Sequence, residues 1–138
     1  WYITGVQLEA GTTASDFEFL PHDVNLARCQ RYCHRVQGIS GDEKSLFPGY
    51  ASDSNTAQLT VTYPVTMRTS PTVTESAMQV NYRGSATNAS LNGTSDQSEY
   101  SLNLLLDADS GTPLTTGDGL RCRLDNSDSA FFQLDAEL

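Results

Sequence analysis

Short segments in which apolar and polar residues alternate dominate the chain from residue 58 onward. A period of two places successive side chains on opposite faces of a β-strand, whereas an amphipathic helix repeats about every 3.6 residues. Turn-forming pairs such as Asn92-Gly93 and Asp118-Gly119 separate the segments, and such pairs supply the positive φ values that tight hairpins require. The alternating apolar positions are Leu59, Val61 and Tyr63; Met78, Val80 and Tyr82; Tyr100, Leu102, Leu104 and Leu106; Leu120, Cys122 and Leu124; and Ala130, Phe132, Leu134, Ala136 and Leu138. This pattern restricts most of the chain to antiparallel β-structure.

A helix is predicted near the N-terminus. Asp23 can cap it, because its carboxylate can accept hydrogen bonds from the free amides of the first turn. Leu26, Cys29 and Cys33 then form an apolar stripe, and we expect the helix to continue to about Arg35 and to lie on a flat sheet. The predicted fold is therefore mainly β: an antiparallel β-sandwich of jelly-roll-like topology with one short amphipathic helix.

The length of 138 residues suits one domain with its own core and is too short to expect two. Residues 1–22 are interpreted as an N-terminal strand and connector, and this strand could be the end of a preceding domain. Residues 23–138 are interpreted as the helix and the β-sandwich. Residues 83–98 contain mostly Gly, Ser, Asn and Thr, with hardly any apolar residue apart from Leu91. This segment is predicted to be a long exposed loop or a flexible hairpin.

The charge and composition exclude two classes of partner. The net charge of −9 argues against nucleic acid, because binding phosphates requires clustered Lys and Arg. No run approaches the roughly 20 apolar residues that span a bilayer, so no membrane insertion is expected. Hydrophobic residues make up 38% and charged residues 18% of the chain. The remainder is rich in uncharged polar residues, which is more typical of virion or extracellular surfaces than of helical cytosolic enzymes.

Residue types that serve in catalytic and metal sites are present without the patterns that such sites need. Cys29, Cys33 and His34 lack the spacing of a zinc site, and the adjacent Cys33 and His34 would diverge on a helix. The chain has no Gly-x-Ser-x-Gly elbow of a serine hydrolase. Turn chemistry alone explains the acidic turns at residues 107–111 and 125–128, which are otherwise calcium candidates. We therefore predict no catalytic residue, no metal and no cofactor, and we interpret the cysteines as packing residues.

Aromatic and amide side chains in polar segments are the candidates for binding a glycan. A pyranose ring can stack on an aromatic face while Asn and Arg side chains bind its hydroxyl groups. Tyr50 follows a Phe-Pro-Gly sequence, and Asn81-Tyr82-Arg83 leads into the polar segment. Tyr82 also continues an alternating segment, so a core position is its alternative. The predicted receptor-binding residues are Tyr50, Asn81, Tyr82, Arg83, Asn88 and Asn92.

Several segments share letters with one known signature. Residues 5–11 read Gly-Val-Gln-Leu-Glu-Ala-Gly, residues 14–18 read Ala-Ser-Asp-Phe-Glu and residues 26–32 read Leu-Ala-Arg-Cys-Gln-Arg-Tyr. These segments resemble the QLE-x-G turn, the T-x-F-E step and the C-Q-R-Y-Y helix of bacteriophage tail fibres and related virion surface proteins. Residues 64–73, Pro-Val-Thr-Met-Arg-Thr-Ser-Pro-Thr-Val, are similar to the P-x-x-M-R-x-x-P-T strand that follows this helix in those proteins. Cys33 stands where that family usually has tyrosine.

The resemblance implies a noncatalytic virion structural protein, a C-terminal tail-fibre-like module that attaches to the host surface through a glycan or another receptor. It implies a homotrimer that contacts other virion proteins and is assembled in the cytoplasm of the host bacterium. A capsid decoration or appendage assembly protein is the alternative from a different class. A glycan hydrolase that uses paired carboxylates is a further alternative. The expected partners are thus copies of the chain itself, other virion proteins and a host-surface glycan or protein.

Overall fold

The computed structural model describes residues 6, 10–13, 15–16, 19–109 and 113–137. Every strand pair within these residues is antiparallel. The prediction of a mainly β fold with one short helix is confirmed. The elements follow in the order α1 (His22–Gln30), β1 (Cys33–Gln37), β2 (Ser45–Ala51), β3 (Thr56–Thr62), β4 (Thr72–Ser76), β5 (Met78–Tyr82), β6 (Ser85–Ser95), β7 (Ser101–Ala108), β8 (Gly119–Leu124) and β9 (Phe131–Asp135).

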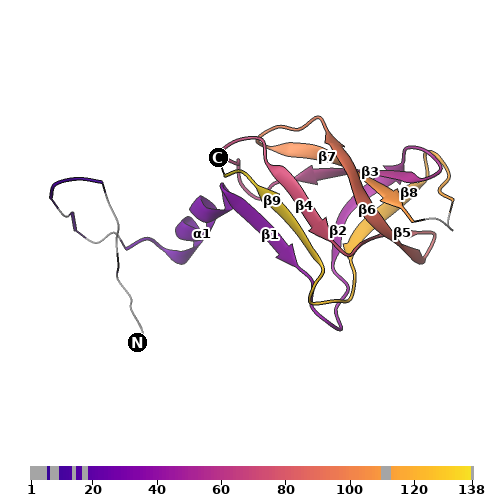
Figure 1. Ribbon diagram of the computed structural model, residues 1–138, viewed down its shortest axis with the longest axis horizontal. Coiled ribbons are helices and arrows are strands. Elements are labelled where there is room, and N and C mark those ends of the chain that lie inside the picture. Colours follow the sequence, from indigo (N-terminus) through magenta and orange to yellow (C-terminus); the bar gives the residue numbers. More distant parts are fainter. Residues whose placement is uncertain (1–5, 7–9, 14, 17–18, 110–112, 138) are drawn as a thin grey trace.

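The strands form two sheets (Figure 1). β1, β9 and β4 make a three-stranded sheet, and the other strands close into a barrel in the order β2-β3-β7-β6-β5-β8. The barrel is closed because β8 pairs with β5 on one side and with β2 on the other. The antiparallel strands are therefore arranged as a closed barrel beside a small sheet, rather than as the clear jelly-roll-like sandwich that the sequence predicts.

Local backbone features allow the barrel to close. A Cβ atom at position 49 would lie 2.2 Å from the Gln58 carbonyl oxygen, so β2 and β3 approach this closely because residue 49 is glycine. A register shift between Ser45 and Pro48 bends β2, and a second shift bends β6. Residue alternation does not encode such bends. A flat sandwich and a closed barrel therefore share one sequence pattern.

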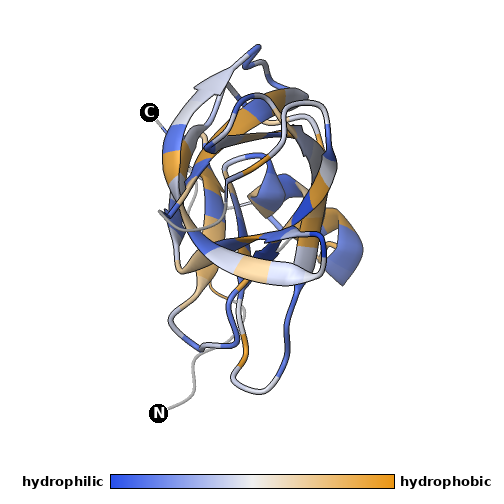
Figure 2. Ribbon diagram, turned by 90° about the vertical axis from the view of Figure 1, so that its right-hand side faces the viewer, coloured by the Kyte–Doolittle hydropathy of each residue, from blue (hydrophilic) through white to orange (hydrophobic). Residues whose placement is uncertain are grey.

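Most of the apolar positions predicted from alternation that the structure describes belong to one continuous core, against which the partly buried Tyr63 packs. Figure 2 looks into the closed ring of barrel strands. Phe47 of β2 contacts Phe132 of β9 edge-on, with ring centroids 5.1 Å apart, and so joins the barrel to the three-stranded sheet. Tyr100 is an exception to the alternation because it precedes β7 and is 64% exposed. The inward-facing barrel residues include Leu59, Val61, Met78, Val80, Leu102, Leu104, Leu106, Leu120, Cys122 and Leu124.

Residues 83–98 do not form the predicted long loop. A two-residue turn at Arg83-Gly84 joins β5 to β6, and β6 extends over 11 residues of the segment. β6 pairs with β5 on one side and with β7 on the other, so its two neighbours satisfy its backbone hydrogen bonds. Ala89 is its one buried side chain. The loop alternative is wrong because a barrel strand with a polar outer face and small inner residues has the composition of a loop. The hairpin alternative is closer, since β6 is one arm of the β5–β6 hairpin.

The helix is shorter and more exposed than predicted. α1 ends at Gln30, has Pro21 rather than Asp23 at its N-cap position, and buries none of its residues. The predicted apolar stripe through Cys33 is wrong, because Cys33 begins β1 and pairs with Asp135 of β9. The pairing of β1 with β9 satisfies backbone groups on one side of β9, which a helix at this point would leave open. In Figure 1, α1 extends away from the strands at the end where β1 begins.

Some predictions concern residues outside the described part of the chain. The predicted N-terminal strand at residues 1–9 lies there apart from Val6, and so do residues 110 and 111 of one acidic turn. The boundary between a connector at residues 1–22 and a domain at residues 23–138 stays a prediction. Among the described residues, no helix combines the length and the apolar character needed to cross a membrane.

Candidate binding site

The β5–β6 turn holds an arginine in a backbone conformation that arginine rarely adopts. Tyr82 pairs with Ser85, which leaves Arg83 and Gly84 as a two-residue loop. Their φ angles are 50° and 85°, the positive pair of a type I′ turn. Asn and Gly favour this geometry, whereas other L residues are strained in it. The hairpin therefore presents Arg83 at its tip against local preference.

Two contacts hold the Arg83 side chain. Its Nη2 donates a hydrogen bond to Oδ2 of Asp118 at 2.7 Å, and the Tyr82 hydroxyl donates to the same oxygen at 2.7 Å. The Arg83 guanidinium carbon also lies 5.0 Å from the centre of the Tyr82 ring. The Tyr82 hydroxyl and then Arg83 hold the pKa of Asp118 below its usual range, and Asp118 raises the pKa of Arg83. Arg83 is therefore charged and restrained although it is exposed.

A shallow hollow of about 510 Å³ lies beside this turn on the outside of the barrel. Arg121 of β8 pairs with Asn81 of β5 and with Pro48 of β2, so these residues form a row across three strands. Arg83 and Gly119 line the same hollow toward the hairpin tip. The hollow thus combines two guanidinium groups, one amide and the apolar surface of a proline.

Arg121 and Arg123 belong to the same face of β8 but have different surroundings. Arg123 donates from Nε to Gln79 at 3.0 Å and forms an ion pair with Glu43, and its side chain is 12% exposed. Within the described part of the chain, the exposed Arg121 guanidinium makes no hydrogen bond or ion pair. Arg123 is therefore occupied by the fold, whereas Arg121 is available to a ligand.

No protein-family model, curated protein or solved structure matches this chain. The chemistry of the hollow therefore follows from its own side chains. Its described lining holds hydrogen-bond donors but no carboxylate, cysteine or histidine, the groups that most often serve in acid–base or nucleophilic catalysis. The arrangement can hold a polar ligand through hydrogen bonds and charge.

Three of the predicted receptor-binding residues lie at the hollow or next to it. Asn81 and Arg83 line it. Tyr50 of β2 does not line it but pairs with Gly119, which does. The Tyr50 side chain is 46% exposed, and its hydroxyl donates to Oε1 of Gln58 at 3.0 Å. The structure therefore brings together residues that are far apart in the sequence.

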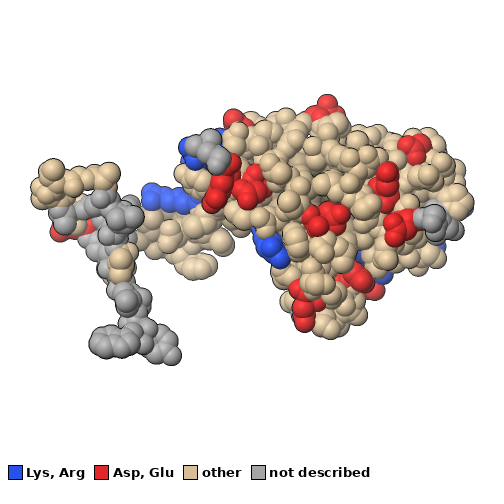
Figure 3. All heavy atoms as spheres, in the orientation of Figure 1, with Lys and Arg blue, Asp and Glu red and all other residues tan. Residues whose placement is uncertain are grey.

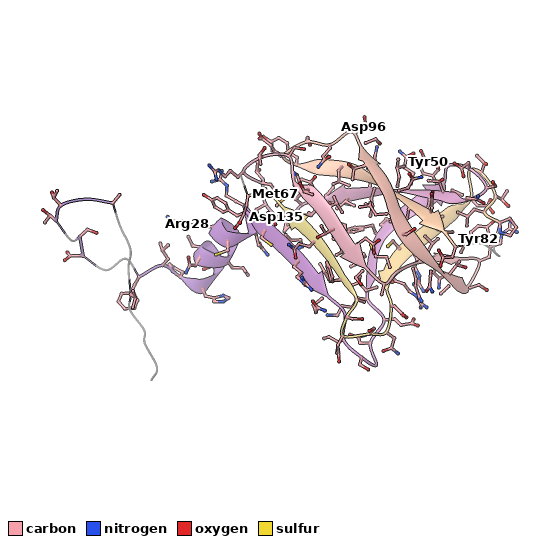
Figure 4. The ribbon with its side chains drawn as sticks, in the orientation of Figure 1. Arg28, Tyr50, Met67, Tyr82, Asp96 and Asp135 are labelled. Carbon is pink, nitrogen blue, oxygen red and sulfur yellow. The ribbon has the colours of Figure 1, made fainter. Side chains whose placement is uncertain are left out.

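Tyr82 has a supporting position rather than a contact surface. Its side chain is only 5% exposed, as the alternating pattern allows, and its hydroxyl reaches Asp118. Figure 4 shows Tyr50 and Tyr82 in the half of the barrel far from Arg28 of α1. The candidate site and the helix therefore lie toward opposite ends of the molecule.

Asn88 and Asn92 do not belong to this site. The Asn88 side chain accepts a hydrogen bond from Gln79 at 3.0 Å, and the Asn92 side chain donates one to Asp107 at 2.9 Å. Neither asparagine lines the hollow. Both tie β6 to its neighbours on the outside of the barrel, so they form cross-strand pairs of a sheet rather than a cluster with the other predicted residues.

The sequence reasoning missed the other residues that line the hollow: Pro48, Gly49, Gly119, Leu120 and Arg121. The alternation of buried Leu120 and Cys122 already places Arg121 on the outward face of its strand. Its exposure was therefore predictable. Its neighbours were not, because the pairing of β8 with both β5 and β2 joins distant parts of the chain.

The cysteines and histidines belong to no cluster of three or more His, Cys, Asp or Glu side chains that could hold a metal ion within the described residues. Cys122 is buried as predicted, whereas Cys29 and Cys33 are exposed and are not packing residues. Burial raises the pKa of Cys122 to about 12, and partial burial raises that of Cys33 and lowers that of His34. A raised thiol pKa leaves less thiolate to act as a nucleophile or a ligand.

A second hollow of about 400 Å³ lies between β4 and β6. Its described lining contains Thr72, Thr94 and Gln97 and no charged side chain. The Gln97 amide already donates to the Pro71 carbonyl oxygen. This hollow therefore has less to offer a ligand than the hollow that contains the arginines.

Proposed function

We propose that this chain is a noncatalytic structural module of a bacteriophage virion, similar to the C-terminal domain of a tail fibre, that attaches to the host surface. The observation that carries the proposal is the hollow lined by Asn81, Arg83 and Arg121, which offers hydrogen-bond donors without a catalytic group in its described lining. Tyr50 beside it offers an exposed ring on which a sugar can stack. A host glycan is therefore the proposed receptor, with a surface protein as its alternative.

The polar outside of the barrel supports a position on the solvent-exposed surface of a virion. Uncharged polar side chains pair across its strands, as Thr60 does with Asn103 at 3.2 Å and Tyr50 with Gln58 at 3.0 Å. Acidic side chains are spread over the face shown in Figure 3. Together with the net charge of −9, they would keep many copies soluble in a crowded assembly.

We further propose that the chain works as a homotrimer in contact with other virion proteins. A helix of nine residues that buries none of them is too short to be stable by itself. Val24 and Leu26 of this helix are 40% and 47% exposed, and a neighbouring copy or another virion protein would cover them. The threefold symmetry comes from the sequence resemblance. Light scattering of the native protein tests it: three copies are expected, and a monomer at all concentrations would overturn it.

A capsid decoration or appendage assembly protein is the second candidate function. The exposed helix favours it, because a module that docks through α1 need not bind a receptor. Labelling the protein on intact particles separates the two candidates. A label at the tip of the tail supports attachment, and a label on the head supports decoration.

Adsorption of the purified chain to intact bacteria tests the attachment directly. The wild-type chain is expected to bind susceptible cells, and the double variant Tyr50→Ala, Asn81→Ala to lose most of this binding. Asn92→Ala, on the barrel surface outside the hollow, is the matched control and should bind like the wild type. Failure of the wild type to bind any host strain, or equal binding by the double variant, would overturn the proposal. Release of reducing sugar from host polysaccharide would indicate the hydrolase instead.

A further inference from the structure

The two arginines of the hollow contrast with the charge of the chain as a whole. The sequence contains 8 Lys and Arg against 17 Asp and Glu. The described lining of the hollow contains Arg83 and Arg121 and no carboxylate. Asp118, which pairs with Arg83, compensates one of the two positive charges. One positive charge is left at the hollow of a chain whose net charge is −9.

Arg83 keeps donors for a ligand. A guanidinium carries five N–H donors, and the ion pair with Asp118 engages Nη2. The Tyr82 ring beneath the guanidinium and the Asp118 carboxylate restrain the side chain. A restrained side chain loses little conformational freedom when a ligand binds. The Arg83 guanidinium is therefore held in place and keeps N–H donors that can bind a ligand.

The backbone strain at Arg83 coincides with this arrangement. Ala77 and Asp96 are the other non-glycine residues with positive φ in the described chain, so positive φ alone does not identify a site. Arg83 differs because it also lines a hollow and has a second arginine across that hollow. Strained residues that a fold retains beside a cavity are candidates for function.

We propose that Arg83 and Arg121 together bind an oxyanion, the carboxylate or phosphate group of a sugar in a host glycan. This inference rests on the proposed attachment function, because it takes the hollow as the receptor site. The Asn81 amide would bind a neighbouring hydroxyl, and Pro48 would contact the sugar ring. A dense polyanion is disfavoured because the net charge of −9 repels it. The ligand therefore carries an isolated anionic group among neutral sugars.

Titration of the isotope-labelled chain with three short probes tests this inference. The probes are a trisaccharide of two galactose units and one galacturonic acid, a galactose trisaccharide without the carboxylate, and a galactose trisaccharide that carries one phosphate group. The backbone amide resonances of Asn81 and Arg121 report binding at the hollow. At least one acidic probe is expected to shift these resonances. The neutral trisaccharide should bind at least about tenfold more weakly than that probe, since charge-assisted hydrogen bonds would be missing. The acidic probe that binds more tightly identifies the source of the oxyanion.

Single substitutions then assign the binding to the two arginines. Arg121→Gln should weaken binding of the acidic probe about tenfold. Arg68→Gln removes the same charge outside the hollow, where Arg68 lies over the Tyr32 ring at 5.5 Å, and should bind like the wild type. Arg83→Asn should also weaken binding, although Asn suits the type I′ turn and the melting temperature should not fall. A loss of binding in a variant that is at least as stable as the wild type has no explanation in misfolding.

The outcomes separate this inference from the attachment function. Equal binding of the neutral trisaccharide, unchanged binding by Arg121→Gln, or no shift with either acidic probe would overturn the oxyanion site. Bacterial adsorption that persists in Arg121→Gln would do the same and leave the attachment function standing. If the wild-type chain adsorbs to no host strain, the attachment function itself fails.

Discussion

The β-structure and α1 use their apolar residues in opposite ways. Alternate strand residues point into one core, where Leu59, Leu104 and Phe132 are 0% exposed. In α1, Val24 and Leu26 remain 40% and 47% exposed, and no residue is buried. Burying a Leu side chain contributes about 1.5–3 kcal/mol. Among the described residues, the strands therefore provide nearly all the hydrophobic stabilisation, and α1 contributes little to it.

Thiol reactivity should separate the two regions most strongly. Cys29 on α1 is exposed, whereas Cys122 is buried in the barrel, where its pKa is raised to about 12. In the native protein at neutral pH, Cys29 should react with a thiol-specific reagent, and Cys122 should react at least about 10³-fold more slowly, because it requires unfolding. Mass spectrometry of the modified chain over time measures both rates. Rapid modification of Cys122 in the native state would contradict the closed barrel.

Truncation of single side chains should give the next largest contrast. Phe132→Ala removes a buried ring that contacts Phe47 and should lower the free energy of unfolding by about 3–5 kcal/mol. Leu26→Ala removes a partly exposed side chain from α1 and should lower it by less than about 0.5 kcal/mol. Urea unfolding at low protein concentration measures both changes.

The Leu26→Ala variant also tests what covers the helix. If α1 is covered by another copy, this variant should dissociate at a higher protein concentration than the wild type, which light scattering detects. If the free energy of unfolding of this variant at low protein concentration fell by several kcal/mol, α1 would instead pack on the barrel of its own copy in solution.

The difference between the two regions also explains which parts of the fold were predictable. Alternation identified the inward residues of β3, β5, β7 and β8, because burial on one face of a strand imposes a period of two. It missed β6, whose Ser, Asn and Thr residues are kept in a strand by pairing with two neighbours. The apolar stripe of Leu26, Cys29 and Cys33 extended the predicted helix too far, because three residues at helical spacing do not reveal that β9 provides a pairing partner. Local patterns thus predicted the elements better than their pairing.

In the candidate site, too, local sequence patterns identified some residues and missed those that strand pairing brings together. Asn81 and Arg83 were predicted because they accompany Tyr82 at the point where an alternating segment leads into a polar one, and both line the hollow. Asn88 and Asn92 were predicted on composition, yet their side chains are engaged in pairs across the sheet. Arg121 was missed because nothing in its local sequence indicates that β8 lies between β5 and β2. The residues that depend on long-range pairing were the ones that the sequence could not identify.

Closure of the barrel can be tested at one glycine. Gly49→Ala would place a Cβ atom 2.2 Å from the Gln58 carbonyl oxygen, a backbone atom, and should lower the free energy of unfolding by about 1–3 kcal/mol. Gly93→Ala is the matched control, because a Cβ atom there meets nothing within 4 Å, and its effect should stay within about 0.5 kcal/mol. Chemical denaturation compares the two. If Gly49→Ala and Gly93→Ala had similar free energies of unfolding, β2 and β3 could move apart at residue 49 without loss of stability.

The smallest effect is expected at His34 of β1, close to where the helix joins the sheet. Partial burial lowers the pKa of His34 from its ordinary value of 6.5. As the pH falls through 6.5, the unfolded chain binds a proton that the folded chain does not, so the stability is fully present above this value and declines below it. The lowered pKa values of Asp53 and Asp118 act only as the pH falls below 3.8, so the window just below 6.5 reports His34.

His34→Gln should remove this decline in stability. The free energy of unfolding that the wild type loses below pH 6.5 should be smaller than the effect of Gly49→Ala, since His34 is only partly buried. Urea unfolding of both proteins across this pH window measures the difference in slope. If the two slopes are equal, His34 is as solvated in the folded chain as in the unfolded one, and the burial of β1 next to the helix is weaker than the structure indicates. If the wild type alone loses stability, His34 of β1 is partly buried in the folded chain, and the contrast between the two regions begins within a few residues of Cys33.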